Sequence, residues 1–231
     1  MTDWSTLTLE PIVAASPIWI RLRDTFTGGP PAGPVSVALE RRVDADWVPI
    51  EYPYQLSVTG DLAFVNLGRT RDPGAVGTFV VRVTVDSFGT ISEAADGATA
   101  VTTTITAWAP DAPVVPLLPD DLRLFPGPSY AFPTRTPLLS GQVLDSHGDP
   151  APRARVWATA TVQNAPRTEE VRSDGDGRFR LPLRWSAGTT DIHATHGAQR
   201  RSITVHVPDH LSSTHQITLN MTQEHAHARV P

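Results

Sequence analysis

The 231-residue chain never sustains the pattern of an amphipathic helix; apolar and polar residues alternate instead in short runs separated by Gly, Pro, Asp and Asn. Alternation with a period of two turns one face of an extended segment to a core and the other to solvent. Many short strands with turn residues between them are typical of antiparallel sandwiches, so the sequence predicts an all-β protein. The expected strands are Ile18–Leu22, Val35–Leu39, Phe79–Val85, Val101–Ile105, Gly141–Leu144, Arg155–Val162, Phe179–Leu181, Asp191–Ala194, Ser202–Val207 and Gln216–Leu219.

A proline-rich stretch divides the chain. Seven of the 22 prolines fall within the 25 residues 109–133. Proline has no amide hydrogen, so such a stretch is not expected to form a central strand. We therefore predict two tandem antiparallel β-sandwiches of immunoglobulin or prealbumin type joined by a Pro-rich connector. The expected boundaries are 1–108 for the first sandwich, 109–136 for the connector, 137–221 for the second sandwich and 222–231 for a C-terminal tail.

The second half of the connector carries three aromatic residues, Phe125, Tyr130 and Phe132. Flexible linkers seldom hold so many aromatics, so we expect this piece to dock onto a sandwich. It is either an ordered strap between the two sandwiches or an interface for a partner protein. Trp4 and Trp47 stand beside polar residues and are the other interface candidates.

The two halves follow one plan. Gly60-Asp61-Leu62-Ala63-Phe64 in the first half matches Gly175-Asp176-Gly177-Arg178-Phe179 in the second as Gly-Asp-x-x-Phe. Gly60, Asp61, Gly175 and Asp176 would supply a turn, and Phe64 and Phe179 would each place an aromatic ring in a core. Trp157, in a predicted strand, is expected to be a third core aromatic.

The second half resembles a known family. Its motifs Ser140–Asp145, Gly148–Val156 and Ser173–Phe179, in this order, are similar to the carboxypeptidase regulatory-like domain. The resemblance implies a prealbumin-like, seven-stranded sandwich over roughly 137–221. It also implies a non-catalytic accessory module, because such domains assist folding, adhesion or assembly.

Composition excludes several kinds of chemistry. All 19 cationic residues are Arg, so a P-loop lysine or a Schiff-base lysine is impossible. The absence of Cys excludes disulfides, thiolate catalysis and iron–sulfur ligation. A pI of 5.9 without a basic cluster makes nucleic acid an unsuitable partner. No apolar run approaches the ~20 residues of a membrane span, so membrane insertion is not expected.

The sequence gives little support to two candidate metal sites. Asp174-Gly175-Asp176-Gly177 begins like a calcium loop, but Arg178 stands where an oxygen ligand belongs, which favours a plain turn. All eight His residues lie after residue 146, without the spacing of a known zinc motif. No Gly-x-Ser-x-Gly motif marks a nucleophile. We therefore expect no metal, no cofactor and no enzymatic activity.

The expected function is that of a structural or adaptor subunit whose partners are other protein subunits. The N-terminus has no signal peptide, so a cytoplasmic location is expected. A particle assembled in the cytoplasm, such as a phage-tail-like contractile injection system, suits this combination, with the chain as a cap, collar or peripheral baseplate component. The stretch Arg123–Pro133 ahead of a regulatory-like domain is also similar to accessory proteins of such systems. The alternative is a module that binds carbohydrate through sandwich loops and exposed Trp residues.

Overall fold

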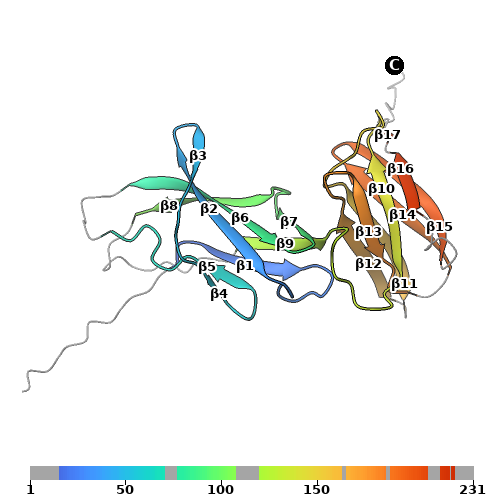
Figure 1. Cartoon of the computed structure of the whole chain (residues 1–231), viewed down its shortest axis with the longest axis horizontal. Helices are drawn as coiled ribbons and strands as arrows, with labels where there is room; N and C mark the ends of the chain where they lie inside the picture. The colour runs from blue at the N-terminus through green and yellow to red at the C-terminus, as the bar shows by residue number, and fades with distance from the viewer. Residues whose placement is uncertain are drawn as a thin grey trace, which may run out of the picture.

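The computed structural model describes residues 16–70, 77–107, 120–162, 165–185, 188–207, 214–218 and 220–221. All strands and sheets within these ranges belong to two β-sandwiches, which confirms the predicted all-β fold (Figure 1). The described residues contain no helix with the length and apolar character of a membrane span.

The first sandwich consists of two facing sheets. Its strands are β1 (Trp19–Asp24), β2 (Val35–Val43), β3 (Asp46–Pro49), β4 (Gln55–Leu56), β5 (Asp61–Ala63), β6 (Thr78–Ser87), β7 (Thr90–Ala94), β8 (Ala100–Thr106) and β9 (Asp120–Pro126). They form one sheet in the order β4-β5-β1-β9-β7 and another in the order β3-β2-β6-β8. Ile20 and Leu122 of the first sheet share a core with Val83 and Ile105 of the second.

The second sandwich has the same construction. Its strands are β10 (Leu138–Leu144), β11 (Arg155–Val162), β12 (Ala165–Arg172), β13 (Arg178–Pro182), β14 (Gly188–His196), β15 (Gln199–Val207), β16 (Thr214–Thr218) and β17 (Asn220–Met221). They form sheets in the orders β13-β10-β16 and β12-β11-β14-β15-β17. Val143 and Leu181 on one sheet pack with Val156 and Ile192 on the other.

The strand pairing repeats between the sandwiches. β1 pairs antiparallel with β5 and parallel with β9, just as β10 pairs antiparallel with β13 and parallel with β16. The order β3-β2-β6-β8 in the first sandwich corresponds to β12-β11-β14-β15 in the second. The two halves are therefore related by topology as well as by turn sequence, and β7 is an additional strand of the first sandwich.

The structural equivalence differs by two residues from the one that the sequence suggested. The amide of Leu22 donates to the carbonyl of Gly60 at 2.9 Å, and the amide of Val143 donates to the carbonyl of Gly177 at 2.8 Å. Gly60 is therefore equivalent to Gly177, whereas the shared Gly-Asp-x-x-Phe pattern matched it to Gly175. Because a shift of two residues keeps every side chain on its own face, Phe64 and Phe179 are both core residues, each only 1% exposed.

Trp157 is not a core residue, contrary to the expectation. Val156 and Ala158 on either side of it are fully buried, so the alternation along β11 turns Trp157 to the outer face of its sheet. There its ring stacks on that of His193, with centroids 5.2 Å apart. The β-branched and small residues of β11, rather than its aromatic, fill the core.

The expectation that residues 109–136 lie outside both sandwiches is wrong for Asp120–Pro126. This segment is β9, which lies between β1 and β7 within the first sandwich. Residues 120–125 contain no proline, and Pro126 is the last residue of the strand, so the proline-rich composition of the wider segment concealed a strand. Residues 1–15, with Trp4, residues 108–119 and the tail 222–231 lie outside the described part of the chain.

Candidate functional site: the junction between the two sandwiches

The two sandwiches meet through four arginines of the second sandwich. Arg153 precedes β11, Arg172 ends β12, Arg180 lies in β13 and Arg184 follows β13. Each donates at least one hydrogen bond to the first sandwich or to the segment that follows β9. We call these arginines and the groups that they contact the junction.

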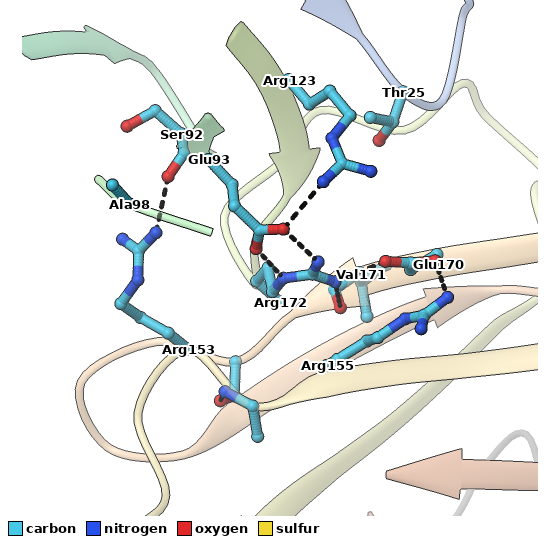
Figure 2. Close-up of polar contacts among 12 residues, drawn as sticks. Thr25, Ser92, Glu93, Ala98, Arg123, Arg153, Arg155, Glu170, Val171 and Arg172 are labelled. Atoms are coloured by element: carbon cyan, nitrogen blue, oxygen red, sulfur yellow. Dashed lines mark hydrogen bonds and ion pairs between the residues drawn. The ribbon is translucent and has the colours of Figure 1, made fainter. Parts of the chain in front are cut away.

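Arg172 makes the most buried of these contacts. Its Nε and Nη2 donate to Oε2 and Oε1 of Glu93 on β7, at 2.6 and 3.0 Å (Figure 2). The side chains of Arg172 and Glu93 are only 5% and 14% exposed. The guanidinium carbon also lies 3.8 Å from the ring centroid of Phe125 on β9. A planar guanidinium suits this place because it can bind a carboxylate at two points while stacking on an aromatic ring.

Glu93 and Arg172 belong to an alternating chain of charges. Arg123 of β9 donates to Glu93 Oε1 at 3.0 Å. On the other side, Arg172 Nη1 donates to Glu170 at 2.7 Å, and Arg155 Nη2 donates to the second oxygen of Glu170 at 2.7 Å (Figure 2). Burial acts to raise the pKa of Glu170, but the hydrogen bonds from Arg155 and Arg172 outweigh it and hold that pKa below its usual value. Glu170 is therefore ionised at neutral pH. Glu93 lies between Arg123 and Arg172, and Glu170 lies between Arg172 and Arg155.

Arg153 adopts a backbone conformation that is unusual for its type. Its φ of 58° lies in the left-handed region, which disfavours residues with a Cβ atom. The turn is held because the amide of Arg153 donates to the carbonyl of Ser173, and Ser173 Oγ donates to the carbonyl of Ala151 at 2.6 Å. In this conformation Arg153 Nη2 donates to the carbonyl of Ser92 on β7 at 2.6 Å. Burial lowers the pKa of Arg153 from its usual value.

Arg184 forms a second two-point contact at the junction. Its Nε and Nη2 donate to the buried Glu169 of β12 at 2.6 and 2.9 Å. The same guanidinium donates through Nη1 to the carbonyl of Phe26 at 3.1 Å and lies 4.3 Å from the centre of its ring. Phe26 belongs to the turn after β1, so Arg184 joins β12 to the first sandwich.

The predicted strap aromatics complete the junction. Tyr130 and Phe132 pack with Phe26 in a group of three rings, with centroids 4.8 to 5.7 Å apart. Arg180 donates to the carbonyl of Pro128 at 3.1 Å and lies 5.8 Å from the ring centre of Phe132. These contacts fix the segment after β9 against both sandwiches. The contacts described for Phe125, Tyr130 and Phe132 are thus made within this chain.

Tyr130 is held by a buried carboxylate. Its hydroxyl donates to Asp24 Oδ2 at 2.6 Å, while Asp24 Oδ1 accepts the backbone amides of Phe26 and Thr27. Asp24 is only 1% exposed. Burial, followed by the hydrogen bond to Asp24, raises the pKa of Tyr130 well above its usual value. The phenol is therefore neutral and remains a donor at all physiological pH values.

Asp145 is the equivalent of Asp24 in the second sandwich. Its Oδ1 accepts the backbone amides of His147 and Asp149, so it holds the following turn in a similar way, although that turn is one residue shorter than the turn after Asp24. No strap covers it in the described structure, and its side chain is 24% exposed. Both sandwiches therefore have an aspartate in this turn, but only Asp24 of the first sandwich binds the connecting segment in the described structure.

The other predicted positions lie away from the junction. Trp47 on β3 is half-buried, with the Arg82 guanidinium 4.5 Å from its ring centre. Asp61 accepts a hydrogen bond from Thr59 at 2.7 Å. Gly175 and Asp176 form a turn in which Asp174 Oδ1 accepts the amide of Asp176 at 3.0 Å. Among the residues that the structure describes, no three His, Asp or Glu side chains are grouped as metal ligands would be.

Sequence reasoning missed the charged half of the junction. The sequence does not mark its charged residues as contacts between the sandwiches, since single charges at strand ends are ordinary surface features. The residues concerned are Glu93, Arg153, Arg172 and Arg184. The exclusive use of Arg was visible, and it suits two-point contacts with carboxylates. The spatial convergence of these residues was not visible, because Glu93 and Arg172 are 79 positions apart.

Among the comparisons with known proteins, one family model matches part of the chain. The family described as Carboxypeptidase regulatory-like domain matches residues 139–220, which cover the second sandwich. The family resemblance of this half is thereby confirmed. No curated protein matches the chain.

Several solved structures match this chain with low TM-scores and low sequence identity. The Bacillus anthracis TIE protein matches with a TM-score of 0.27 and 13% identity, over 89% of this chain and 33% of that protein. The Streptococcal ancillary pilin matches with a TM-score of 0.31 and 10% identity, over 91% of this chain and 64% of that one. BcpA, the major pilin subunit of Bacillus cereus, matches with a TM-score of 0.27 and 7% identity, over 91% of this chain and 70% of that one. This chain therefore spans about a third and about two thirds of the first two proteins. Scores this low carry no function from these proteins to this one.

Proposed function

We propose that this chain is a non-enzymatic structural or adaptor subunit, in which two sandwiches act as one rigid unit within a larger protein assembly. The observation that carries the proposal is the contact between Arg172 and Glu93. A guanidinium this buried and this fully bonded resists hinge motion, because separating the sandwiches would leave the partly buried Glu93 without its main partner.

A rigid connection between the sandwiches distinguishes an adaptor subunit from two independently moving modules on a tether. Contacts between domains of one chain commonly resemble transient interfaces and permit relative motion. Here the strap, which bonds to Asp24 through Tyr130 and to Arg180 through Pro128, the Arg172 contact and the Arg184 contact join the same pair of sandwiches at three places. A subunit that holds two binding surfaces at a fixed separation needs this property. The match of the second sandwich to an accessory-domain family also supports a non-catalytic role.

The setting that we propose is a particle assembled in the cytoplasm, of the phage-tail-like contractile type. The chain would occupy a cap, collar or peripheral baseplate position there. The support for this setting is the sequence of the strap, Arg123–Pro133, which stands directly ahead of the regulatory-like domain. This setting is a more specific proposal than the structural role, and an experiment can contradict the setting without contradicting the role.

Sedimentation of a native lysate tests both levels. We expect this chain in the heavy fraction, and mass spectrometry of that fraction identifies its neighbours. Sheath, tube and baseplate proteins in the same fraction would support the contractile setting. Other structural proteins there would overturn that setting and keep the structural role. Recovery of the chain only as a free small species would overturn the structural role itself.

Glycan binding has less support from the geometry. Stacking of a sugar needs an open aromatic face. Of the two predicted surface Trp residues, Trp4 lies outside the described residues and Trp47 has an arginine near its ring, as does Trp157 on the outer face of β11. Arg82 lies 4.5 Å from the ring centre of Trp47, and Arg155 lies 4.5 Å from that of Trp157. Retention on glycan resin, lost on substitution of either Trp, would reverse this preference.

A further inference from the structure

Within the described part of the chain, the outer edge of β8 has no strand paired with it. β8 ends the order β3-β2-β6-β8, and β6 is its one neighbour among the described strands. Backbone groups on such an edge can pair with another chain, and proteins commonly protect edges with charges, proline or short length.

Composition distinguishes β8 from the other edge strands. Among edge strands of five or more residues in the described part of the chain, β8 alone has neither an ionisable side chain nor proline. The others are β7 with Glu93, β12 with several charges, β13 with Arg178 and Arg180, and β16 with His215. β8 reads Ala-Val-Thr-Thr-Thr-Ile-Thr over seven residues, nearly all of high β propensity.

The sequence of β8 is also complementary to itself. In an antiparallel pair of two copies centred on Thr103, Val101 of one copy faces Ile105 of the other. The same register places Thr102 opposite Thr104. Val101 and Ile105 are buried on the core side, whereas Thr102 and Thr104 are exposed on the outer side. Apolar residues therefore meet apolar residues, threonines meet threonines, and no like charges meet.

We propose that a second copy of this chain pairs with β8 through its own β8, so that two four-stranded sheets join into one across a two-fold axis. The occupant is a second copy because the strand offers no charge that would select a different partner, and its two halves match each other about Thr103. This inference is independent of the proposed function, since two copies would pair whatever larger structure contains them.

An introduced cysteine tests the register. The chain has no Cys, so any disulfide must come from the substitution. Thr103→Cys places two thiols directly opposite each other in the proposed pair, within reach of a disulfide after a small movement. Ser36→Cys is the control, because Ser36 is exposed on β2, two strands away from β8 in the same sheet, and has no place in the proposed register. Mild oxidation should give a covalent dimer of the Thr103→Cys variant at least tenfold faster than of the Ser36→Cys variant.

Charge on the edge tests the pairing itself. In the double variant Thr102→Lys with Thr104→Lys, each lysine would face a lysine of the second copy, which should weaken the dimer at least tenfold in sedimentation equilibrium. The control, Ser36→Lys with Ala38→Lys, adds the same charge to the same face of the sheet, two strands away from the β8 edge. Circular dichroism and the melting temperature establish that both variants are folded.

These experiments decide whether two copies pair through β8. A wild-type chain that dimerises with concentration, and whose dimer is weakened only by the edge lysines, supports the proposal. A wild-type chain that stays monomeric up to about 1 mM overturns it, since even weak specific interfaces associate at that concentration. Equal weakening by both lysine pairs, or equal oxidation of both cysteine variants, also overturns it. None of these results changes the lysate sedimentation test of the structural role.

Discussion

Arg172 and Glu93 bind each other at two points across the junction, with distances of 2.6 and 3.0 Å between their nitrogen and oxygen atoms. The ring of Phe125 lies against the same guanidinium. Glu170 accepts a hydrogen bond from Nη1 of Arg172. The contact is therefore fully bonded as well as buried. Such a pair contributes rigidity more than net stability, but removal of one partner is costly, because the other charge stays behind in a poorly hydrated place.

Arg172→Ala should weaken the union of the two sandwiches. We expect a loss of about 3 kcal/mol of unfolding free energy and the division of one thermal transition into two, because Glu93 loses its buried partner. Arg172→Lys should recover less than half of the loss, since an ammonium cannot bind both carboxylate oxygens in the same plane. Calorimetry measures the transitions, and small-angle scattering measures the change in molecular dimensions.

Arg178→Ala is the matched control for that experiment. Arg178 pairs with Asp176 at 3.5 Å, and both side chains are about two thirds exposed, at 67% and 68%. Exposed pairs contribute little, so the change should stay within about 0.5 kcal/mol. A single unchanged transition in Arg172→Ala would refute the rigid junction.

The strained backbone of Arg153 can be measured by comparing two substitutions. Arg153→Ala and Arg153→Gly both remove the hydrogen bond to Ser92, but only glycine relieves the φ of 58°. The glycine variant should therefore be more stable than the alanine variant by about 1 kcal/mol in urea unfolding. Asp44, with a φ of 53° on an exposed turn, should show the same order and so calibrates the comparison. An alanine variant as stable as the glycine variant would show that Arg153 is not strained in solution.

Glycine substitutions test which turn residues are equivalent in the two sandwiches. A Cβ atom on Gly177 would lie 2.3 Å from the carbonyl oxygen of Val143, and one on Gly60 would lie 2.7 Å from that of Leu22. Both glycines also have positive φ angles, of 73° and 87°. Gly177→Ala and Gly60→Ala should each destabilise their own sandwich by at least about 2 kcal/mol.

Gly175→Ala serves as the control in the same turn, because a Cβ atom there would meet no atom within 4 Å. Its effect should remain within about 0.5 kcal/mol in urea unfolding. If Gly175→Ala proved as harmful as Gly177→Ala, the equivalence of Gly60 with Gly177 would be wrong.

The sequence predicted the fold class well because strand alternation and turn residues are local signals. Phe64 and Phe179 could be recognised as apolar residues after turns, and their burial follows from the alternation of each strand. Trp157 was misplaced because hydrophobicity alone does not say which face of a strand is inside, and its small neighbours Val156 and Ala158 occupy that face.

The junction could not be predicted because it is built by long-range contacts. Arg153 reaches Ser92 across 61 positions, and Tyr130 reaches Asp24 across 106. Each of these residues is unremarkable in its local sequence. Only the aromatic content of the strap hinted that the segment after residue 120 packs against something, and strand β9 was hidden by the prolines on both sides of it.

The hydrogen bond from Tyr130 to Asp24 predicts the response to alkaline pH. Tyr130→Phe should cost about 1–3 kcal/mol at neutral pH, because it leaves an oxygen of the buried Asp24 without its donor. Tyr54→Phe is the control, since its hydroxyl makes only an exposed contact of 3.4 Å with the carbonyl of Val35. Equal losses from Tyr130→Phe and Tyr54→Phe at neutral pH would contradict a buried role for the Tyr130 hydroxyl.

The direction of the pH effect follows from the raised pKa of Tyr130. The unfolded chain releases this proton near the usual pKa of 10.0, whereas burial and Asp24 retain it in the folded chain. The stabilisation is therefore complete below pH 10 and falls as the pH rises above it, by up to about 1.4 kcal/mol per pH unit for one proton. Tyr130→Phe should remove this part of the slope and leave the smaller part due to Tyr52, whose pKa burial also raises. Urea unfolding at pH 9, 10 and 11 measures the loss of stability, and tyrosinate absorbance recorded in parallel measures the ionisation of the tyrosines. If the stability of the wild type fell with pH as steeply as that of Tyr130→Phe and no more, Tyr130 would ionise as readily in the folded chain as in the unfolded one.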